Sequence, residues 1–119
     1  MINYMDVWKK YFGNETKAVD VFGVLIYKNK YNSNENGSWT IDHIFPRSPH
    51  NDNAGYVRKG RNCLENLQPL SIFSNQKKGS FLGGKVNGVT FSVKIIHKDE
   101  NGVIGQMMIK KGNKWYTIE

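Results

Sequence analysis

The sequence predicts a single α+β domain. The chain has 119 residues, which is the usual length of one domain. A helical pattern of apolar residues opens it, and three β-rich runs separated by turn residues close it. With 39% hydrophobic and 23% charged residues, the composition supports a modest core and excludes an intrinsically disordered chain. We therefore expect one domain over residues 1–119.

The first expected element is a short amphipathic helix over residues 4–12. Met5, Trp8 and Phe12 recur at helical spacing, and Gly13 can end the helix. Residues 19–27 are rich in β-formers but contain Gly23, which predicts a bent strand or two short strands.

A second strand is expected over residues 39–45, because a polar loop precedes it at residues 32–38 and Pro46 stops it. Residues 48–60 form a long polar loop in this interpretation. A further short strand region covers residues 64–70 and is broken by Pro69. Residues 71–78 fit a helix with Ser71 as its N-cap that ends before Gly79.

The C-terminal part alternates turn-forming and β-forming residues. The glycine-rich stretch at residues 79–88 indicates turns. Residues 89–96, 103–109 and 115–118 are β-rich, and turn-forming residues separate them at 98–102 and 111–113. We expect an antiparallel β meander that forms a C-terminal extension over about residues 85–119.

Several protein classes are excluded at this point. The longest apolar run is about seven residues, whereas a membrane span needs roughly twenty. The first residues carry neither the basic start nor the apolar stretch of a secretory signal. Cys63 is the single cysteine, which rules out an internal disulfide framework and a multi-cysteine zinc site. We expect a cytoplasmic protein.

The charge balance points to a polyanion as the partner. Lys and Arg number 17 against 10 for Asp and Glu, giving a net charge of +7. A basic domain of this kind most often binds nucleic acid, and no membrane partner is expected. A merely cationic surface is the alternative that charge alone leaves open.

One constellation of residues carries recognisable chemistry. Asp42 and His43 stand side by side near a strand end, Asn66 lies in the next loop, and Asn75 lies on the short helix. A helix packed across the two strands brings Asp42, His43 and Asn75 together. Asp42 and Asn75 offer the hard oxygen atoms that suit Mg²⁺ or Mn²⁺, and His43 can deprotonate a water molecule. This combination is typical of phosphodiester hydrolysis.

The same residues resemble the motifs of a known family, the HNH (ββα-metal) endonucleases. The three matching segments are Asp42-His43-Ile44 with Pro46, Asn66-Leu67-Gln68-Pro69-Leu70, and Asn75-x-x-Lys78. The last motif residue is Asn, as in phage homing endonucleases and in the HNH domain of RNA-guided CRISPR effectors. The upstream segment from Trp8 to Trp39 is also similar to small stand-alone bacterial and phage members. The resemblance covers roughly residues 8–80.

The resemblance implies a fold and a set of roles. It implies a ββα-metal core over about residues 39–80 and a metal-dependent DNA endonuclease activity. His43 would be the general base, Asp42 and Asn75 the metal ligands, and Asn66 would hold the catalytic loop through hydrogen bonds to the backbone. The paired cysteines that give many members a structural zinc are missing, so no zinc is expected.

Basic residues near the motifs are candidates for phosphate contacts. They are Arg47 after the first motif, Arg58, Lys59 and Arg61 in the loop, and Lys77 and Lys78 on the helix. For the three loop residues, a solvated charged surface remains the alternative.

Other functions remain open from the sequence. A non-catalytic DNA-binding module would keep the same fold. An RNase or a nuclease toxin, the latter paired with an immunity protein, would use similar chemistry. The biological setting, phage or restriction, is likewise undetermined.

Overall fold

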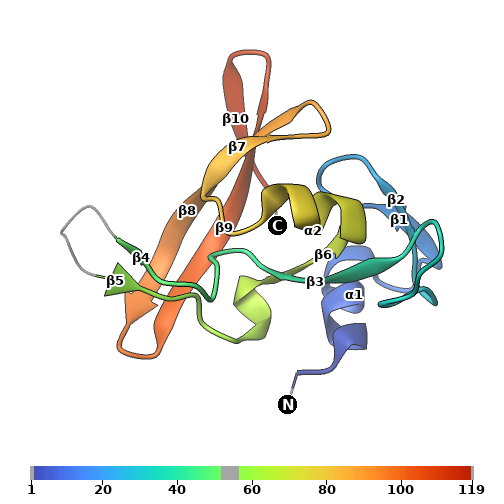
Figure 1. Ribbon diagram of the computed structural model, residues 1–119, viewed down its shortest axis with the longest axis horizontal. Coiled ribbons are helices and arrows are strands. Elements are labelled where there is room, and N and C mark those ends of the chain that lie inside the picture. Colours follow the sequence, from blue (N-terminus) through green and yellow to red (C-terminus); the bar gives the residue numbers. More distant parts are fainter. Residues whose placement is uncertain (1, 52–56, 119) are drawn as a thin grey trace.

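Helices and antiparallel strands combine in an α+β fold in the computed structural model, which describes residues 2–51 and 57–118 (Figure 1). In chain order the elements are α1 (Tyr4–Phe12), β1 (Lys17–Val19), β2 (Leu25–Tyr27), β3 (Trp39–His43), β4 (His50–Asn51), β5 (Val57–Arg58), a 3₁₀ turn (Leu64–Asn66), β6 (Leu67–Ser71), α2 (Ile72–Lys78), β7 (Gly83–Val86), β8 (Val89–Asp99), β9 (Gly102–Lys111) and β10 (Lys114–Thr117).

The N-terminal part is built around buried aromatic side chains. The Asn3 side chain accepts a hydrogen bond from the Met5 backbone N–H and caps α1, and Gly13 ends the helix with a positive φ of 59°. Trp8 of α1, Ile26 of β2 and Trp39 of β3 form one fully buried cluster. This cluster holds α1 and the β1–β2 hairpin against the start of β3.

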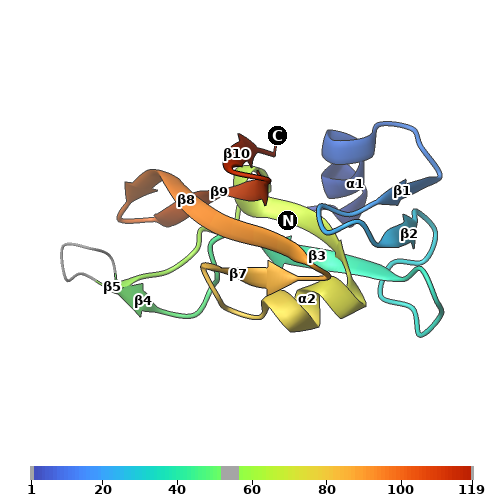
Figure 2. The ribbon, with the colours of Figure 1, turned by 90° about the horizontal axis from the view of Figure 1, so that it is seen from above.

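The centre of the molecule is the antiparallel pair β3–β6, which α2 covers. In its register Asp42 lies opposite Gln68, and His43 lies opposite Leu67. The Ser71 hydroxyl caps α2 by accepting from the backbone N–H of Ser74. Figure 2 shows α1 and α2 on opposite sides of β3. Both helices also contact β6, which explains why all of its residues are buried.

The C-terminal residues form a four-stranded antiparallel sheet in the order β10-β9-β8-β7. Its inner face packs on the central pair through one apolar cluster, whose buried members are Phe22, Ile44, Leu70, Val86, Phe91, Met107 and Ile109. The expected meander is therefore confirmed, and it shares a core with the rest of the chain.

Three expectations about local structure were wrong. Pro69 does not break its strand but pairs with Ile41 inside β6, because a two-stranded sheet has only edge strands and an edge tolerates a missing N–H. Part of the glycine-rich stretch forms β7 instead of turns. The long polar loop contains the short pair β4–β5, although residues 52–56 lie outside the described part. None of the described helices is long and apolar enough to cross a membrane.

Candidate active site

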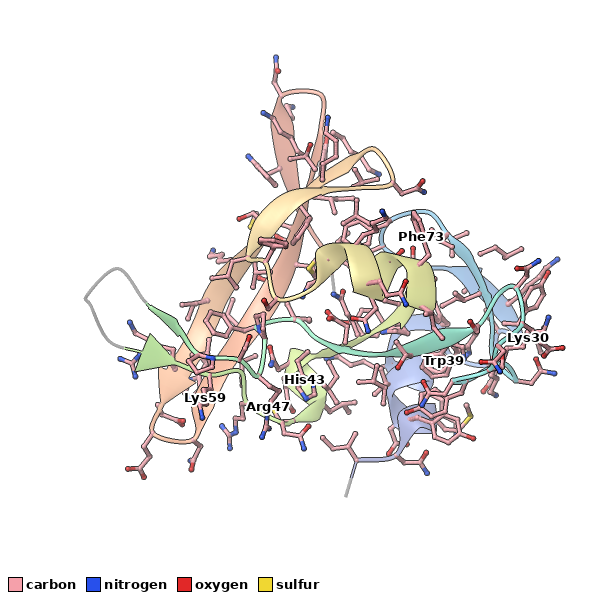
Figure 3. All side chains as sticks on the ribbon, viewed as in Figure 1. Lys30, Trp39, His43, Arg47, Lys59 and Phe73 are labelled. Atoms are coloured by element: carbon pink, nitrogen blue, oxygen red, sulfur yellow. The ribbon has the colours of Figure 1, made fainter. Side chains whose placement is uncertain are left out.

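Asp42, His43 and Asn75 line the same open hollow, which has a volume of about 280 Å³. The first two residues come from the end of β3, and Asn75 comes from the middle of α2. They meet because α2 packs on both strands of the β3–β6 pair. Arg47 also lines the hollow, and Figure 3 shows it close to His43. The structure thus brings together four of the residues that the sequence selected.

Asp42 is almost completely buried, with 5% of its surface exposed. Its Oδ2 atom accepts a hydrogen bond of 2.9 Å from the Gln68 side-chain amide, its neighbour in the β3–β6 register. Burial raises the pKa of this carboxyl above its ordinary value, while the Lys78 ammonium group and the Gln68 amide act in the opposite direction. The ionised form of Asp42 therefore depends on Lys78 and Gln68 for its stabilisation.

Lys78 corrects an expectation from the sequence. Its side chain is fully buried, and Nζ lies 3.1 Å from Oδ2 of Asp42. The ammonium group also donates hydrogen bonds to the backbone carbonyls of His43 and Ile44, at 3.4 and 3.2 Å. A lysine enclosed in this way has no exposed surface to offer a phosphate. In this structure Lys78 is the internal counter-ion of Asp42.

His43 is held through one ring nitrogen. Nε2 lies 2.9 Å from Oδ1 of Asn62, in the segment before the 3₁₀ turn. Because an amide oxygen only accepts hydrogen bonds, this contact requires the hydrogen to be on Nε2. The lone pair is then on Nδ1, and this nitrogen is the atom that can accept a proton.

Asn66 is completely buried and makes four hydrogen bonds to backbone groups. Its side chain accepts from the N–H groups of Phe45 and Gly105 and donates to the carbonyls of Phe45 and Arg61. These bonds fix the chain that follows His43 to the chain that precedes the 3₁₀ turn. Asn66 makes the backbone contacts expected of it, and it additionally ties the site to β9.

The donor set in the hollow fits a hard divalent cation. Asp42 supplies a carboxylate, and the Asn75 amide has no hydrogen-bond partner among the described residues. Carboxylate and amide oxygens are ligands that Mg²⁺ and Ca²⁺ accept. Within residues 2–51 and 57–118, no three His, Cys, Asp or Glu side chains are grouped as a metal site. Asp42 and Asn75 are the two candidate ligands that the sequence selected, and the hydroxyl-bearing Ser48 and Ser80 line the same hollow.

The basic residues selected from the sequence occupy different environments. Arg47 borders the site and also a neighbouring hollow of about 380 Å³, which is lined by Arg58 and Lys59 and by the acidic turn between β8 and β9. Figure 3 shows Arg47 and Lys59 on the same side of the molecule as His43. Arg61 is partly neutralised, since it lies 3.8 Å from Asp99. Lys77 is exposed, with Nζ 5.8 Å from the centre of the Phe73 ring.

Three residues that contact the site residues were not predicted from the sequence to do so. Gln68 could have been found, because the β3–β6 register places it opposite Asp42. Asn62 lies in an irregular segment, where no periodicity shows which way a side chain points. Gly105 is separated from Asn66 by 39 positions. A Cβ atom there would come within 3.0 Å of the Phe45 backbone nitrogen, so glycine permits the close approach of β9.

Comparison of the chain with protein-family models, curated protein sequences and solved structures finds no match.

Proposed function

We propose that this protein is a metal-dependent DNA endonuclease that hydrolyses phosphodiester bonds. The observation that carries the proposal is the common hollow lined by Asp42, His43 and Asn75. These residues lie on an antiparallel strand pair and on a short helix that contacts both strands, which supports the proposal of a ββα-metal core. The net charge of +7 supports a polyanionic substrate.

His43 is the general base in this proposal. Asn62 holds Nε2–H, so Nδ1 accepts a proton from the attacking water molecule. The water oxygen forms a bond to phosphorus as the bond from phosphorus to the leaving oxygen breaks. Asn66 acts as a positioning residue, because its backbone hydrogen bonds fix the segment next to His43.

Asp42 and Asn75 would hold the cation. Mg²⁺ or Mn²⁺ bound there would stabilise the negative charge that develops on the leaving oxygen. Asp42 supplies a single formal negative charge, which Lys78 already offsets in the structure. A weak site follows, so activity is expected to require added Mg²⁺ and to disappear with a chelator.

Arg47 would bind a phosphate next to the one that is cleaved, since it borders both the site and the hollow lined by Arg58 and Lys59. Log affinity for duplex DNA should fall linearly with log salt, by about 0.9 per phosphate contact. Arg47→Gln should make this slope shallower by about one. Lys78 is buried, so neutralising it should not act through a lost phosphate contact.

The decisive experiment is cleavage of supercoiled plasmid with and without Mg²⁺. His43→Ala should lower the rate by about 10²- to 10⁴-fold, the range for a lost general base. His97→Ala is the matched control, because His97 is an exposed histidine on β8 that pairs with Asp99 and does not line the site. Equal rates for wild type and His43→Ala would reject the proposed role of His43.

The alternative functions give different results in the same assay. Cleavage of single-stranded RNA with no cleavage of DNA would indicate an RNase or a nuclease toxin. DNA binding without cleavage in Mg²⁺ or Mn²⁺ would indicate a binding module. The observation that favours this last alternative is the ion pair with Lys78, which occupies the carboxylate of Asp42.

A further inference from the structure

The C-terminal sheet has one row of side chains that runs across all four strands. Trp115 of β10 lies opposite Lys110 of β9, Lys110 lies opposite Thr90 of β8, and Thr90 lies opposite Lys85 of β7. Directly paired residues point to the same face of a sheet. The row therefore places an aromatic side chain and two lysines on one face.

This face points away from the core. The adjacent row contains Ile109 and Phe91, which are buried in the apolar cluster, and successive residues of a strand point to opposite faces. Trp115 is 43% exposed, whereas Trp8 and Trp39 are completely buried. Trp115 is thus the tryptophan that a ligand on this face can reach.

The outward face carries no carboxylate on the part of the sheet that precedes the bulge between Ile95 and His97. On this part its positions are Gly83, Lys85, Thr90, Ser92, Lys94, Gln106, Met108, Lys110, Trp115 and Thr117. They include three lysines, four hydrogen-bonding side chains and no carboxylate. With strands about 4.8 Å apart, the row from Lys85 to Trp115 spans roughly 14 Å. That length accommodates a short stretch of an extended polymer.

One end of the row is linked along the chain to the candidate active site. Lys85 also lines a hollow of about 270 Å³ between the end of α2 and β7, together with Lys77 and the exposed ring of Phe81. The two residues just before this ring, Gly79 and Ser80, line the hollow that contains His43 and Asn75. Lysines and an exposed aromatic ring thus continue from the site to the sheet.

We propose that the outward face of β7–β10 binds a single strand of nucleic acid. The lysines offset the phosphates, and Trp115 stacks on a base, a contact that every base can make. A single strand is required because a duplex keeps the faces of its bases inside the stack. If the proposed nuclease function holds, on which this step rests, the face receives an unpaired flank of the substrate next to the cleaved bond.

The test measures binding separately from cleavage. Fluorescein-labelled dT12 is titrated into the His43→Ala protein in EDTA, and both anisotropy and tryptophan emission are recorded. Emission should be quenched, because Trp115 is the exposed tryptophan. Trp115→Leu should weaken binding about tenfold. Lys110→Gln should make the salt dependence shallower by about 0.7, the value for one contact to a single strand.

Two neighbours provide matched controls. Tyr116, which is 47% exposed, and Lys111 occupy the same strands but point to the opposite face, where Lys111 Nζ lies 5.9 Å from the Tyr116 ring. Tyr116→Leu and Lys111→Gln should change affinity less than twofold. Trp115→Phe keeps an aromatic face, so it should retain most of the affinity and lose the emission change. Circular dichroism checks that each variant is folded.

Three outcomes would overturn the proposal. The first is an equal loss of affinity for dT12 in Trp115→Leu and Tyr116→Leu, or in Lys110→Gln and Lys111→Gln. The second is equal affinity for a duplex of the same length, and the third is stronger binding to phosphatidylserine vesicles than to dT12. Failure of the nuclease proposal looks different: plasmid and oligonucleotide remain uncut in Mg²⁺, while the Trp115-dependent binding of dT12 persists.

Discussion

Replacing Lys78 by methionine removes the cation that faces the buried carboxylate of Asp42. Nζ and Oδ2 are 3.1 Å apart, so their attraction is about 5 kcal/mol at an effective dielectric constant of 20. Methionine has a similar length and keeps the apolar packing. The variant leaves Asp42 buried and unpaired, and we expect the free energy of unfolding to fall by about 3–5 kcal/mol at pH 8.

The dependence on pH gives this prediction a definite sign. Without Lys78, no ammonium group lowers the pKa of Asp42 by its charge, while burial still raises this pKa. The folded pKa then lies further above the unfolded value, so the protonated carboxyl favours the folded state. Stability from this group is present at acidic pH and is lost as the pH rises through the folded pKa. The deficit of Lys78→Met should therefore be smaller at pH 5 than at pH 8.

Urea denaturation of four proteins measures the effect: wild type, Lys78→Met, Asp42→Asn and the double variant. The double variant has neither charge and should be less than about 2 kcal/mol below wild type, which gives strong coupling between the two sites. At constant ionic strength, Mg²⁺ should raise the melting temperature of Lys78→Met more than that of wild type, because the freed carboxylate binds the ion better.

The reasoning would be refuted by a loss below about 1 kcal/mol in Lys78→Met, or by additive effects in the double variant. A Mg²⁺ effect that persists in Asp42→Asn would exclude Asp42 as a ligand.

Three further changes test other parts of the structure. Asn75→His should shift the metal preference of cleavage from Mg²⁺ toward Mn²⁺, Co²⁺ or Ni²⁺. Asn75→Ala should lose most activity with every metal. Identical metal preferences for wild type and Asn75→His would mean that Asn75 does not touch the ion. Asn66→Ala leaves the buried N–H groups of Phe45 and Gly105 without an acceptor and should cost about 3–5 kcal/mol in urea denaturation; a loss under 1 kcal/mol would contradict this. Burial, with a smaller contribution from the carboxylate of Asp42, raises the pKa of Tyr11 to about 12, so the folded state resists ionisation of this phenol and loses stability above pH 10. At pH 11 the free energy of unfolding of Tyr11→Phe should therefore rise by about 1 kcal/mol relative to wild type. No such rise would refute the pKa shift.

The sequence by itself determined the elements that depend on local interactions. Asn3 and Gly13 bound α1, and Ser71 and Gly79 bound α2, because capping involves groups within a few positions of each other. The alternation and turns of the last third predicted β8, β9 and β10 for the same reason. The placement of Asp42, His43 and Asn75 around one hollow was also predictable, because two strands followed by a helix have few ways to pack.

The tertiary structure alone decided what each charged or polar side chain faces. Lys78 looked like an exposed lysine at a helix end, but α2 packs so that its ammonium group lies against Asp42, 36 positions earlier in the chain. Asn62 reaches His43 across 19 positions, and Asn66 reaches Gly105 across 39. The outward row of the C-terminal sheet likewise exists only through strand register. Such contacts join residues whose separation in sequence has no fixed period, so only the packing of complete elements selects them.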